Sequence, residues 1–183
     1  MNPGKVIVIS SPSGGGKTTI IQKLREMNPD LMYAISATTR VPRGQEKEGN
    51  DYFYLNKKDF KKRIQDNEFL EWAEVHGNYY GTLRSQVSDC LLQGKNIILD
   101  IDVQGGLAVQ KQLKETILIF LMPPSINVLE NRLRSRGTDD GETIENRLKA
   151  ASQEMQAAEQ YDYIIYNHDI EQAVHDIQQI IQS

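Results

Sequence analysis

One short segment sets the architecture of this chain, and it reads Ser11-Pro12-Ser13-Gly14-Gly15-Gly16-Lys17-Thr18. It follows an apolar run at residues 6–9 and precedes residues 19–24, which have helical spacing. A strand, a glycine-rich turn and a helix start form the setting of a phosphate-binding loop, where backbone N–H groups and the helix N-terminus hold phosphate oxygens. In such a loop Lys17 reaches the terminal phosphates of a nucleotide, and the Thr18 hydroxyl binds Mg²⁺. The segment therefore predicts a nucleotide-binding P-loop.

The segment departs from the usual P-loop pattern at its first position, where glycine is expected and this chain has Ser11. If Ser11 adopts a positive φ, serine costs on the order of 1 kcal/mol relative to glycine. The alternative interpretation is a glycine-rich turn with an isolated lysine. We disfavour it because strand, loop, lysine and helix fall in register.

Composition narrows the classes of function. A chain of 183 residues can form one α/β domain with a sizeable core and small insertions. Its 21 Lys and Arg against 25 Asp and Glu argue against a general binder of nucleic acid or anionic membranes. The single cysteine, Cys90, excludes an intramolecular disulfide and fits a reducing compartment. With no signal-peptide pattern and no apolar run near about 18 residues, we expect a soluble, cytoplasmic protein.

Apolar runs outline a parallel sheet. Buried strands are predicted at residues 5–10, 96–102, 117–122 and 163–166, and helical spacing separates them. Residues 33–82 contain short strand patterns and one charged helix, so we expect a small strand-rich insertion there. The first expected helix follows the P-loop and ends near residue 27. Further helices are expected at residues 57–67, 83–92, 103–113, 126–135, 142–160 and 170–181.

Two arginines of the predicted insertion suit a phosphate monoester. The Val41-Pro42 step forces extended backbone, in which residues three apart return to one side, so Arg40 and Arg43 face the same ligand. Guanidinium forks match phosphate oxygens in pairs. The alternative is a pair of solvated arginines near a turn.

Carboxylates end the strand predicted at residues 96–102. Asp100 and Asp102 point to one face of a strand, and an acid at the end of a buried strand holds Mg²⁺ or its waters in P-loop enzymes. The alternative for Asp102 is the N-cap of the following helix, but Asp100 lies too deep in the strand for that.

A third carboxylate, Glu71, lies in a segment with period-two alternation. The alternation places Phe69, Glu71, Ala73 and Val75 on one face of the strand. A carboxylate among apolar neighbours is costly unless it has a partner. We therefore expect Glu71 to bind one.

Arginines also mark the region after residue 126. Arg132 and Arg136 are spaced i and i+4 and share one helix face, and Arg147 lies in the next helix. The loop at residues 136–141 has a glycine near each end, which is typical of a lid.

These motifs together resemble guanylate kinase, and the resemblance covers essentially the whole chain. The P-loop alone is common to many families, whereas the Thr-Thr-Arg-x-Pro-Arg and Gly-Asn-Tyr-Tyr-Gly motifs are far more specific. The resemblance rests on the P-loop and on Thr38-Thr39-Arg40-Val41-Pro42-Arg43, Glu71-Trp72, Gly77-Asn78-Tyr79-Tyr80-Gly81, Leu99-Asp100-Ile101-Asp102-Val103-Gln104-Gly105, Pro123-Pro124-Ser125 and Arg136-Gly137-Thr138.

The resemblance implies an α/β P-loop kinase fold with a central parallel five-stranded sheet flanked by helices, a small strand-rich GMP-binding insertion and a mobile lid. Residues 1–183 then form one domain. Its core comprises residues 1–32, 83–126 and 162–183, the insertion residues 33–82, and the lid region with its flanking helices residues 127–161. The implied reaction is ATP plus GMP to ADP plus GDP, with Mg²⁺, in guanine nucleotide metabolism; dGMP is an expected second acceptor.

The resemblance also assigns residues. Four would hold the GMP phosphate, namely Arg40, Arg43, Tyr52 and Tyr80. Four would read guanine, namely Ser36, Glu71, Thr82 and Asp102, with Thr82 where family members often have serine. ATP would contact Ser11, Pro12, Ser13, Gly14, Gly15, Gly16, Lys17, Thr18, Thr19 and, near the adenine, Asn167. Thr18 and Asp100 would support Mg²⁺, partly through water, and the catalytic charges would be Lys17, Arg132, Arg136 and Arg147.

Two other functions stay open at this point. A kinase of another nucleoside monophosphate or of a ribose phosphate could use the same frame, although the guanine-reading set argues against it. A non-catalytic module that binds phosphorylated peptides is the second, but such modules typically lose the P-loop, which is intact here. We expect small nucleotides as partners, without nucleic acid or membrane, and the oligomeric state is open.

Overall fold

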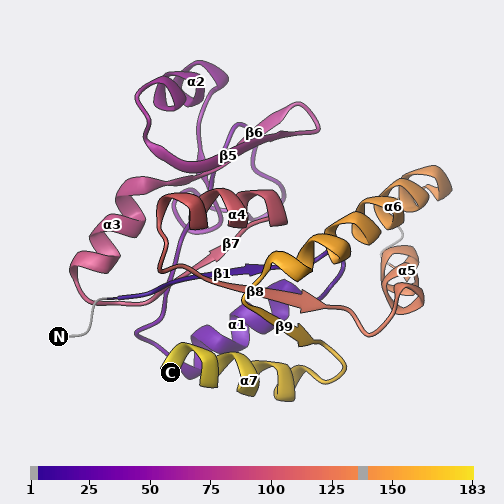
Figure 1. Ribbon diagram of the computed structural model, residues 1–183. Coiled ribbons are helices and arrows are strands. Elements are labelled where there is room, and N and C mark those ends of the chain that lie inside the picture. The colour runs from indigo at the N-terminus through magenta and orange to yellow at the C-terminus, as the bar shows by residue number, and fades with distance from the viewer. Residues whose placement is uncertain (1–3, 136–139) are drawn as a thin grey trace.

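The computed structural model describes residues 4–135 and 140–183, which form two β-sheets and the helices around them (Figure 1). No helix of the described residues is long and apolar enough to cross a membrane. The elements in chain order are β1 (Val6–Ser10), α1 (Lys17–Met27), β2 (Met32–Tyr33), β3 (Ala37–Thr38), β4 (Phe53–Tyr54), α2 (Lys57–Gln65), β5 (Phe69–Val75), β6 (Asn78–Leu83), α3 (Arg84–Leu92), β7 (Ile97–Asp100), α4 (Val103–Gln112), β8 (Ile117–Met122), α5 (Ile126–Ser135), α6 (Gly141–Ala157), the 3₁₀-helix Ala158–Gln160, β9 (Tyr163–Tyr166) and α7 (Ile170–Gln182).

The larger sheet has five strands in the order β2-β7-β1-β8-β9, and its pairings are parallel. Strand β1 lies in the middle and is buried along its whole length, as expected for a central strand covered on both faces. The predicted five-stranded parallel sheet is confirmed. All of its strands end at the same edge, so the loops that follow them meet there.

Helices cover both faces of this sheet (Figure 1). On one face, residues of α1 and α7 pack with Ile7 and Ile9 of β1. On the other face, residues of α3 and α4 pack with Val6 and Val8, together with Ala158 and Tyr161. The period-two alternation of β1 therefore supplies both halves of the core.

The smaller sheet forms most of the predicted insertion and has the order β4-β3-β6-β5. Phe60 of α2 packs against Phe69 and Ala37 of this sheet, so the insertion has a small core of its own. In Figure 1 it projects from the larger sheet beside α4. The predicted range 33–82 differs by one residue at each end, because Tyr33 pairs in the larger sheet and β6 continues to Leu83.

Strand β5 contains a bulge that sequence alternation did not reveal. Phe69 pairs with Leu83 and Glu71 pairs with Thr82, so one extra residue lies between them. Phe69 therefore packs under α2, whereas Leu70 joins the core of the larger sheet. The prediction that Phe69 shares a face with Glu71 was wrong because the bulge changes the alternation at this point.

Helices α5 and α6 form a separate apolar cluster through Leu129, Leu133, Ile144 and Ala151. In Figure 1, α6 extends outward from the larger sheet. The lid predicted at residues 136–141 falls mostly outside the described residues, and so does Arg136.

Candidate active site

The carboxyl edge of the larger sheet collects the loops in which the sequence placed the nucleotide site. The P-loop follows β1, Ile101 and Asp102 follow β7, and Asn167 follows β9. Because β1 lies between β7 and β8, the loops around it open at the point where ligands bind in open α/β sheets. Residues predicted to bind the nucleotides therefore lie at one edge of the sheet.

The P-loop curls over the start of α1. Gly14 and Gly16 have φ of 87° and 93°, a region that favours glycine, and Gly15 N donates to Pro12 O at 2.8 Å. In the described chain, the non-glycine residues with positive φ are Asn67 and His76. The strain considered for Ser11 is therefore absent.

Two side chains from distant elements hold the loop backbone. Asn167 Nδ2 donates to Gly15 O at 2.8 Å, and Arg132 donates to Gly14 O at 3.4 Å. Glycine is required at position 16, because a Cβ there would lie 2.5 Å from Asn167 Nδ2. The Asn167 Oδ1 atom is buried and has no hydrogen-bond partner among the described residues, which is costly and leaves an acceptor for a ligand donor.

Lys17 joins the P-loop to the end of β7. Its Nζ lies 2.5 Å from Asp100 Oδ1 and donates to Ile101 O at 3.3 Å. Strand β7 ends at Asp100 rather than at residue 102 as predicted. Asp102 instead caps α4, since its Oδ1 accepts from Gly105 N at 2.7 Å, so the N-cap alternative was right for this residue.

A cavity of about 230 Å³ lies between the two sheets and adjoins this lysine–carboxylate pair. Asp100 belongs to both, so the cavity reaches the carboxylate that Lys17 of the P-loop contacts. Most of the residues predicted to bind the second substrate meet here. The lining comprises Ser36, Tyr52, Glu71, Ala73, Val75, Tyr80, Gly81, Asp100, Ile101 and Asp102.

Glu71 has the partner that its predicted position required. The Thr82 hydroxyl donates to Glu71 Oε1 at 2.7 Å, and Thr82 is buried. Burial raises the pKa of Glu71, the charge of Asp102 adds to this shift, and the hydrogen bond from Thr82 opposes it. Gly105 leaves room for the carboxylate, because a Cβ there would lie 3.2 Å from Glu71 Oε2.

Arg40 is buried and held in a fixed orientation next to Tyr52, which lines the cavity. Two of its nitrogens donate to the two oxygens of Glu46 at 2.9 Å each, and its guanidinium lies 5.2 Å from the centre of the Tyr52 ring. Hydrogen bonds to Glu46 and to Tyr80 raise the pKa of Arg40 against the effect of burial. Arg40, Tyr52 and Tyr80 thus meet as predicted.

Glu46 is a residue that the sequence interpretation missed. Besides Arg40, the Tyr54 hydroxyl and Arg43 N donate to Glu46 Oε2, at 2.8 and 2.7 Å. These donors lower the pKa of Glu46 to about 2, with Arg40 the largest cause. The signal was available, since Arg40, Arg43 and Glu46 follow one another at intervals of three. The Arg43 side chain is exposed, and its contact with the phosphate of GMP stays a prediction.

A second missed carboxylate, Glu154, approaches from α6. Burial raises the pKa of Glu154, the charge of Asp102 adds to the shift, and the charge of Lys17 opposes it. Glu154 and Asp102 line one small cavity, which places Glu154 near the site. Arg147 lies two turns earlier on the same helix and is half-buried, while Thr18 and Thr19 are exposed in the first turn of α1.

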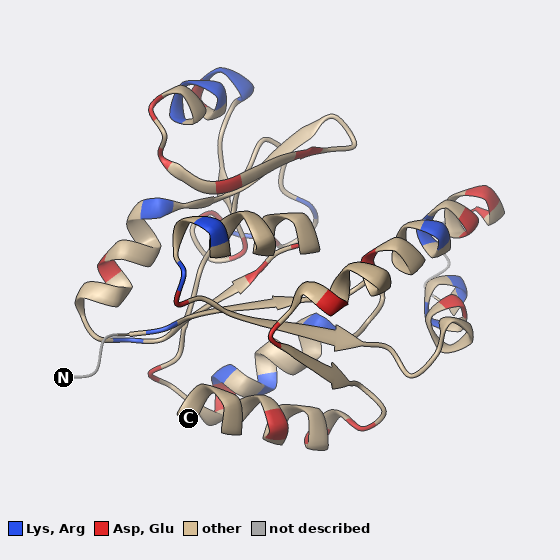
Figure 2. Cartoon of the chain, viewed as in Figure 1, with Lys and Arg blue, Asp and Glu red and all other residues tan. Residues whose placement is uncertain are grey.

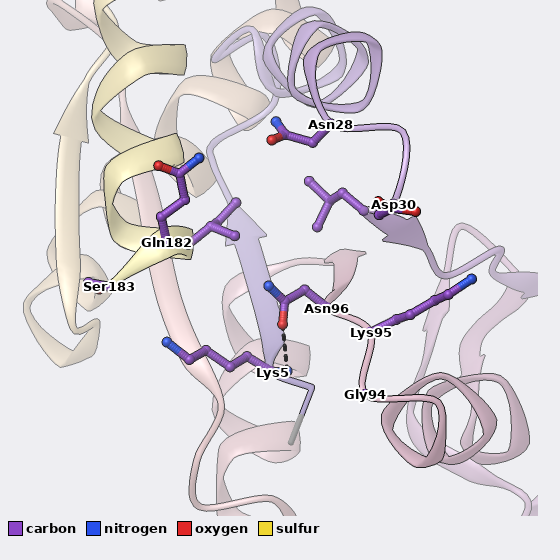
Figure 3. Close-up of a pocket in the computed structure, with 10 residues that line it drawn as sticks. Lys5, Asn28, Asp30, Gly94, Lys95, Asn96, Gln182 and Ser183 are labelled. Atoms are coloured by element: carbon purple, nitrogen blue, oxygen red, sulfur yellow. Dashed lines mark hydrogen bonds between the residues drawn. The ribbon is translucent and has the colours of Figure 1, made fainter. Parts of the chain in front are cut away.

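A larger cavity, of about 540 Å³, lies elsewhere (Figure 3). Its lining comes from the amino ends of β1 and β7, the segment between α1 and β2, and the end of α7. Within it, the backbone N of Lys5 donates to Asn96 Oδ1 at 2.9 Å. None of the predicted site residues lines it. Figure 2 shows that basic residues also gather on α2, at the outer end of the insertion, whereas Glu71, Asp100 and Asp102 make the smaller cavity acidic.

A P-loop on a five-stranded parallel sheet, with an acceptor cavity under an inserted sheet, defines a P-loop kinase. The family model described as guanylate kinase matches residues 3–183, and the chain belongs to the guanylate kinase family. It is 46% identical over 181 residues to the guanylate kinase of Carboxydothermus hydrogenoformans, covering 99% of this chain and 89% of that one. The guanylate kinase of Polaromonas sp. is 42% identical over 181 residues, covering 99% and 88%.

A solved structure agrees with these relatives. The crystal structure of guanylate kinase from Anaplasma phagocytophilum superposes with a TM-score of 0.81 at 35% identity, covering 100% of this chain and 86% of that one. The similarity therefore includes both sheets and helices α5 and α6.

Proposed function

We propose roles for the residues of this site in ATP:GMP phosphotransfer, the reaction of the family to which this chain belongs. One observation carries the proposal. Asp100 lines the acceptor cavity and also lies 2.5 Å from the P-loop Lys17, so the donor and acceptor halves of the site adjoin. Transfer between two bound phosphates requires that arrangement.

On the donor side, the P-loop backbone at residues 11–19 holds the phosphates of ATP, and Lys17 neutralises the group that moves. Arg132, already bound to Gly14 O, and Arg147 add charge from the lid region, with Arg136 as a further expected contributor. Asn167 Oδ1, which is buried and has no partner in residues 4–135 and 140–183, would accept from the amino group of adenine.

The residues present also fit Mg²⁺. Among the described residues, no three His, Cys, Asp or Glu side chains form a metal-binding group, and Mg²⁺ commonly uses only one or two carboxylates with phosphates and waters. Thr18 and Asp100 are the oxygen donors that would hold it. When bound, Mg²⁺ neutralises charge on the phosphate oxygens.

On the acceptor side, Arg40 holds the phosphate of GMP together with Tyr52 and Tyr80, and Glu46 keeps the Arg40 fork in place. Arg43 completes the clamp. The guanine base then lies against Glu71, with Ser36, Thr82 and Asp102 as the remaining contacts. Because base and phosphate carry the recognition, dGMP is a second acceptor in this proposal.

Chemistry in this site depends on position and charge. The phosphate of GMP is already an anion, so no side chain has to act as a strong base. Lys17 and the arginines offset the charge on the moving group, and closure of the insertion and lid over the substrates excludes water, which would otherwise hydrolyse ATP. A free buried thiol at Cys90 fits the cytoplasm as the compartment.

A lysine substitution tests these assignments. Lys17→Met should lower kcat by about 10²–10⁴-fold, because removal of one donor to the developing charge costs roughly 3–5 kcal/mol. The matched control is Lys23→Met, on the same helix, where the lysine pairs with Glu171 at the surface. Turnover should be measured by ADP release with GMP, and folding by circular dichroism. Near-normal turnover of a folded Lys17→Met variant would refute the assignment.

A further inference from the structure

A chain of buried hydrogen bonds runs behind the P-loop. The Tyr161 hydroxyl donates to Ser10 Oγ at 2.8 Å, and the Ser10 hydroxyl donates to Ile101 O at 2.8 Å. Ser10 is fully buried and Tyr161 nearly so. The three residues come from the end of β1, the loop after β7 and the segment before β9, so the chain links parts of the protein that are remote in sequence.

The chain ends on the carbonyl that the P-loop lysine also uses. Lys17 Nζ donates to Ile101 O at 3.3 Å, so this oxygen accepts from both Ser10 and Lys17. Ile101 stands between Asp100 and Asp102, and Lys17 pairs with Asp100 at 2.5 Å. The position of one peptide group therefore affects the lysine and both carboxylates.

The Tyr161 hydroxyl occupies a space that a glycine keeps open. A Cβ at position 106 would lie 2.3 Å from its oxygen. The ring of Phe120 packs against the tyrosine edge to face, with centroids 5.7 Å apart. Burial raises the pKa of Tyr161 to about 12, so the hydroxyl remains a neutral donor at pH 7. The donor is thus fixed in place and in protonation state.

We propose that Tyr161 is a positioning residue for phosphoryl transfer, acting through Ser10 on the peptide that orients Lys17 and Asp100. The proposal rests on the roles of Lys17 and Asp100 given above. Its physical basis is that small displacements of charged groups in such a site reduce the rate strongly. Glu71 and Arg40 lie outside this chain of hydrogen bonds, and Asp102 is held separately by Gly105 N, so binding of GMP should change little when the chain is broken.

The first test is Tyr161→Phe, which removes the hydroxyl and keeps the ring. We expect kcat to fall about 3- to 10-fold, the equivalent of one hydrogen bond, with KM for GMP unchanged within about twofold. Tyr163→Phe is the control, because Tyr163 is exposed two residues away. A lower melting temperature with unchanged kcat would show a purely structural role and would overturn the proposal.

A double-mutant cycle tests whether Tyr161 acts through Ser10. In a Ser10→Ala background, Tyr161→Phe should have little further effect on kcat, since the connection is already broken. Effects that multiply would mean that the two residues act independently, which contradicts the proposal.

If Tyr161→Phe does not fold, Gly106→Ala displaces the same hydroxyl from the other side. It should lower kcat by a similar factor, and an unchanged kcat would overturn the proposal. Wild-type transfer to GMP and its loss in Lys17→Met report on the proposed function separately, so failure of one inference can be told from failure of the other.

Discussion

Replacing Glu71 with alanine should remove most of the preference for GMP over AMP. Guanine presents two donors on one edge, N1–H and the 2-amino group, and a carboxylate can accept both. Adenine has an acceptor at N1 and no 2-amino group, so Glu71 would face it with an unpaired charge. Burial around Glu71 makes that mismatch costly, because a site built around hydrogen bonds rejects a ligand that lacks them.

The expected magnitude follows from the contacts of the carboxylate. Each hydrogen bond to a charged group contributes about 1.5–3 kcal/mol, so two contribute roughly 3–6 kcal/mol, or about 10²–10⁴ in kcat/KM. Thr82 is only 1% exposed, and its hydroxyl donates to Glu71 at 2.7 Å. Glu71→Ala therefore also leaves this buried hydroxyl without its acceptor. That cost affects GMP and AMP alike and cancels in their ratio.

The assay is kcat/KM for GMP and for AMP on wild type and variant, by ADP release. The control is Glu74→Ala, an exposed carboxylate on the same strand whose pairing partner is Tyr79. We expect the GMP/AMP ratio to fall by about 10²–10⁴ for Glu71→Ala and to stay unchanged for Glu74→Ala. If Glu71→Ala lowered kcat/KM for GMP and for AMP by the same factor, Glu71 would be a structural carboxylate.

Three further predictions concern other parts of the site. Arg43→Ala should raise KM for GMP and for AMP by the same factor, roughly 10-fold or more, because a phosphate contact does not depend on the base; a change confined to one acceptor would contradict the clamp. Ser11→Gly should leave the melting temperature and kcat nearly unchanged, since Ser11 lacks a positive φ, and a large loss of kcat would show that its hydroxyl contacts nucleotide. The pKa of Glu46 is lowered from 4.5 to about 2, so its contribution to stability is present above pH 4.5 and lost toward pH 2. In urea melts, Glu46→Gln should lose less unfolding free energy than the wild type over this pH range, and equal losses would refute the ion pair with Arg40.

The local motifs were the part of the molecule that the sequence predicted best. The P-loop could be predicted because a strand, its glycines and the following helix are contiguous, and their geometry depends on neighbouring residues. The acceptor cavity could be predicted only in part. Glu71 was singled out because a carboxylate among apolar residues needs a partner. Thr82 entered only as a guanine contact implied by the family resemblance, and its hydrogen bond to Glu71 was not predicted.

The remaining features depend on contacts between remote segments. The bulge before Glu71 follows from how β5 pairs with β6, and alternation within β5 could not reveal it. Tyr161 and Ser10 are 151 residues apart, and no periodicity connects them. Glu46 is close to Arg40 in sequence and was overlooked for another reason: the regular spacing of Arg40, Arg43 and Glu46 does not by itself show which charges pair.

This chain belongs to a family that phosphorylates GMP at the expense of ATP, and transfer to a guanine nucleotide can be measured directly. The most direct measurement incubates the protein with ATP, Mg²⁺ and each of GMP, dGMP, AMP, UMP and CMP, and quantifies the nucleoside diphosphates by chromatography. We predict GDP and dGDP as the main products, with kcat/KM for GMP exceeding that for AMP by roughly 10⁴. Equal or faster transfer to AMP, UMP or CMP, or no transfer to GMP by the folded protein, would contradict the account.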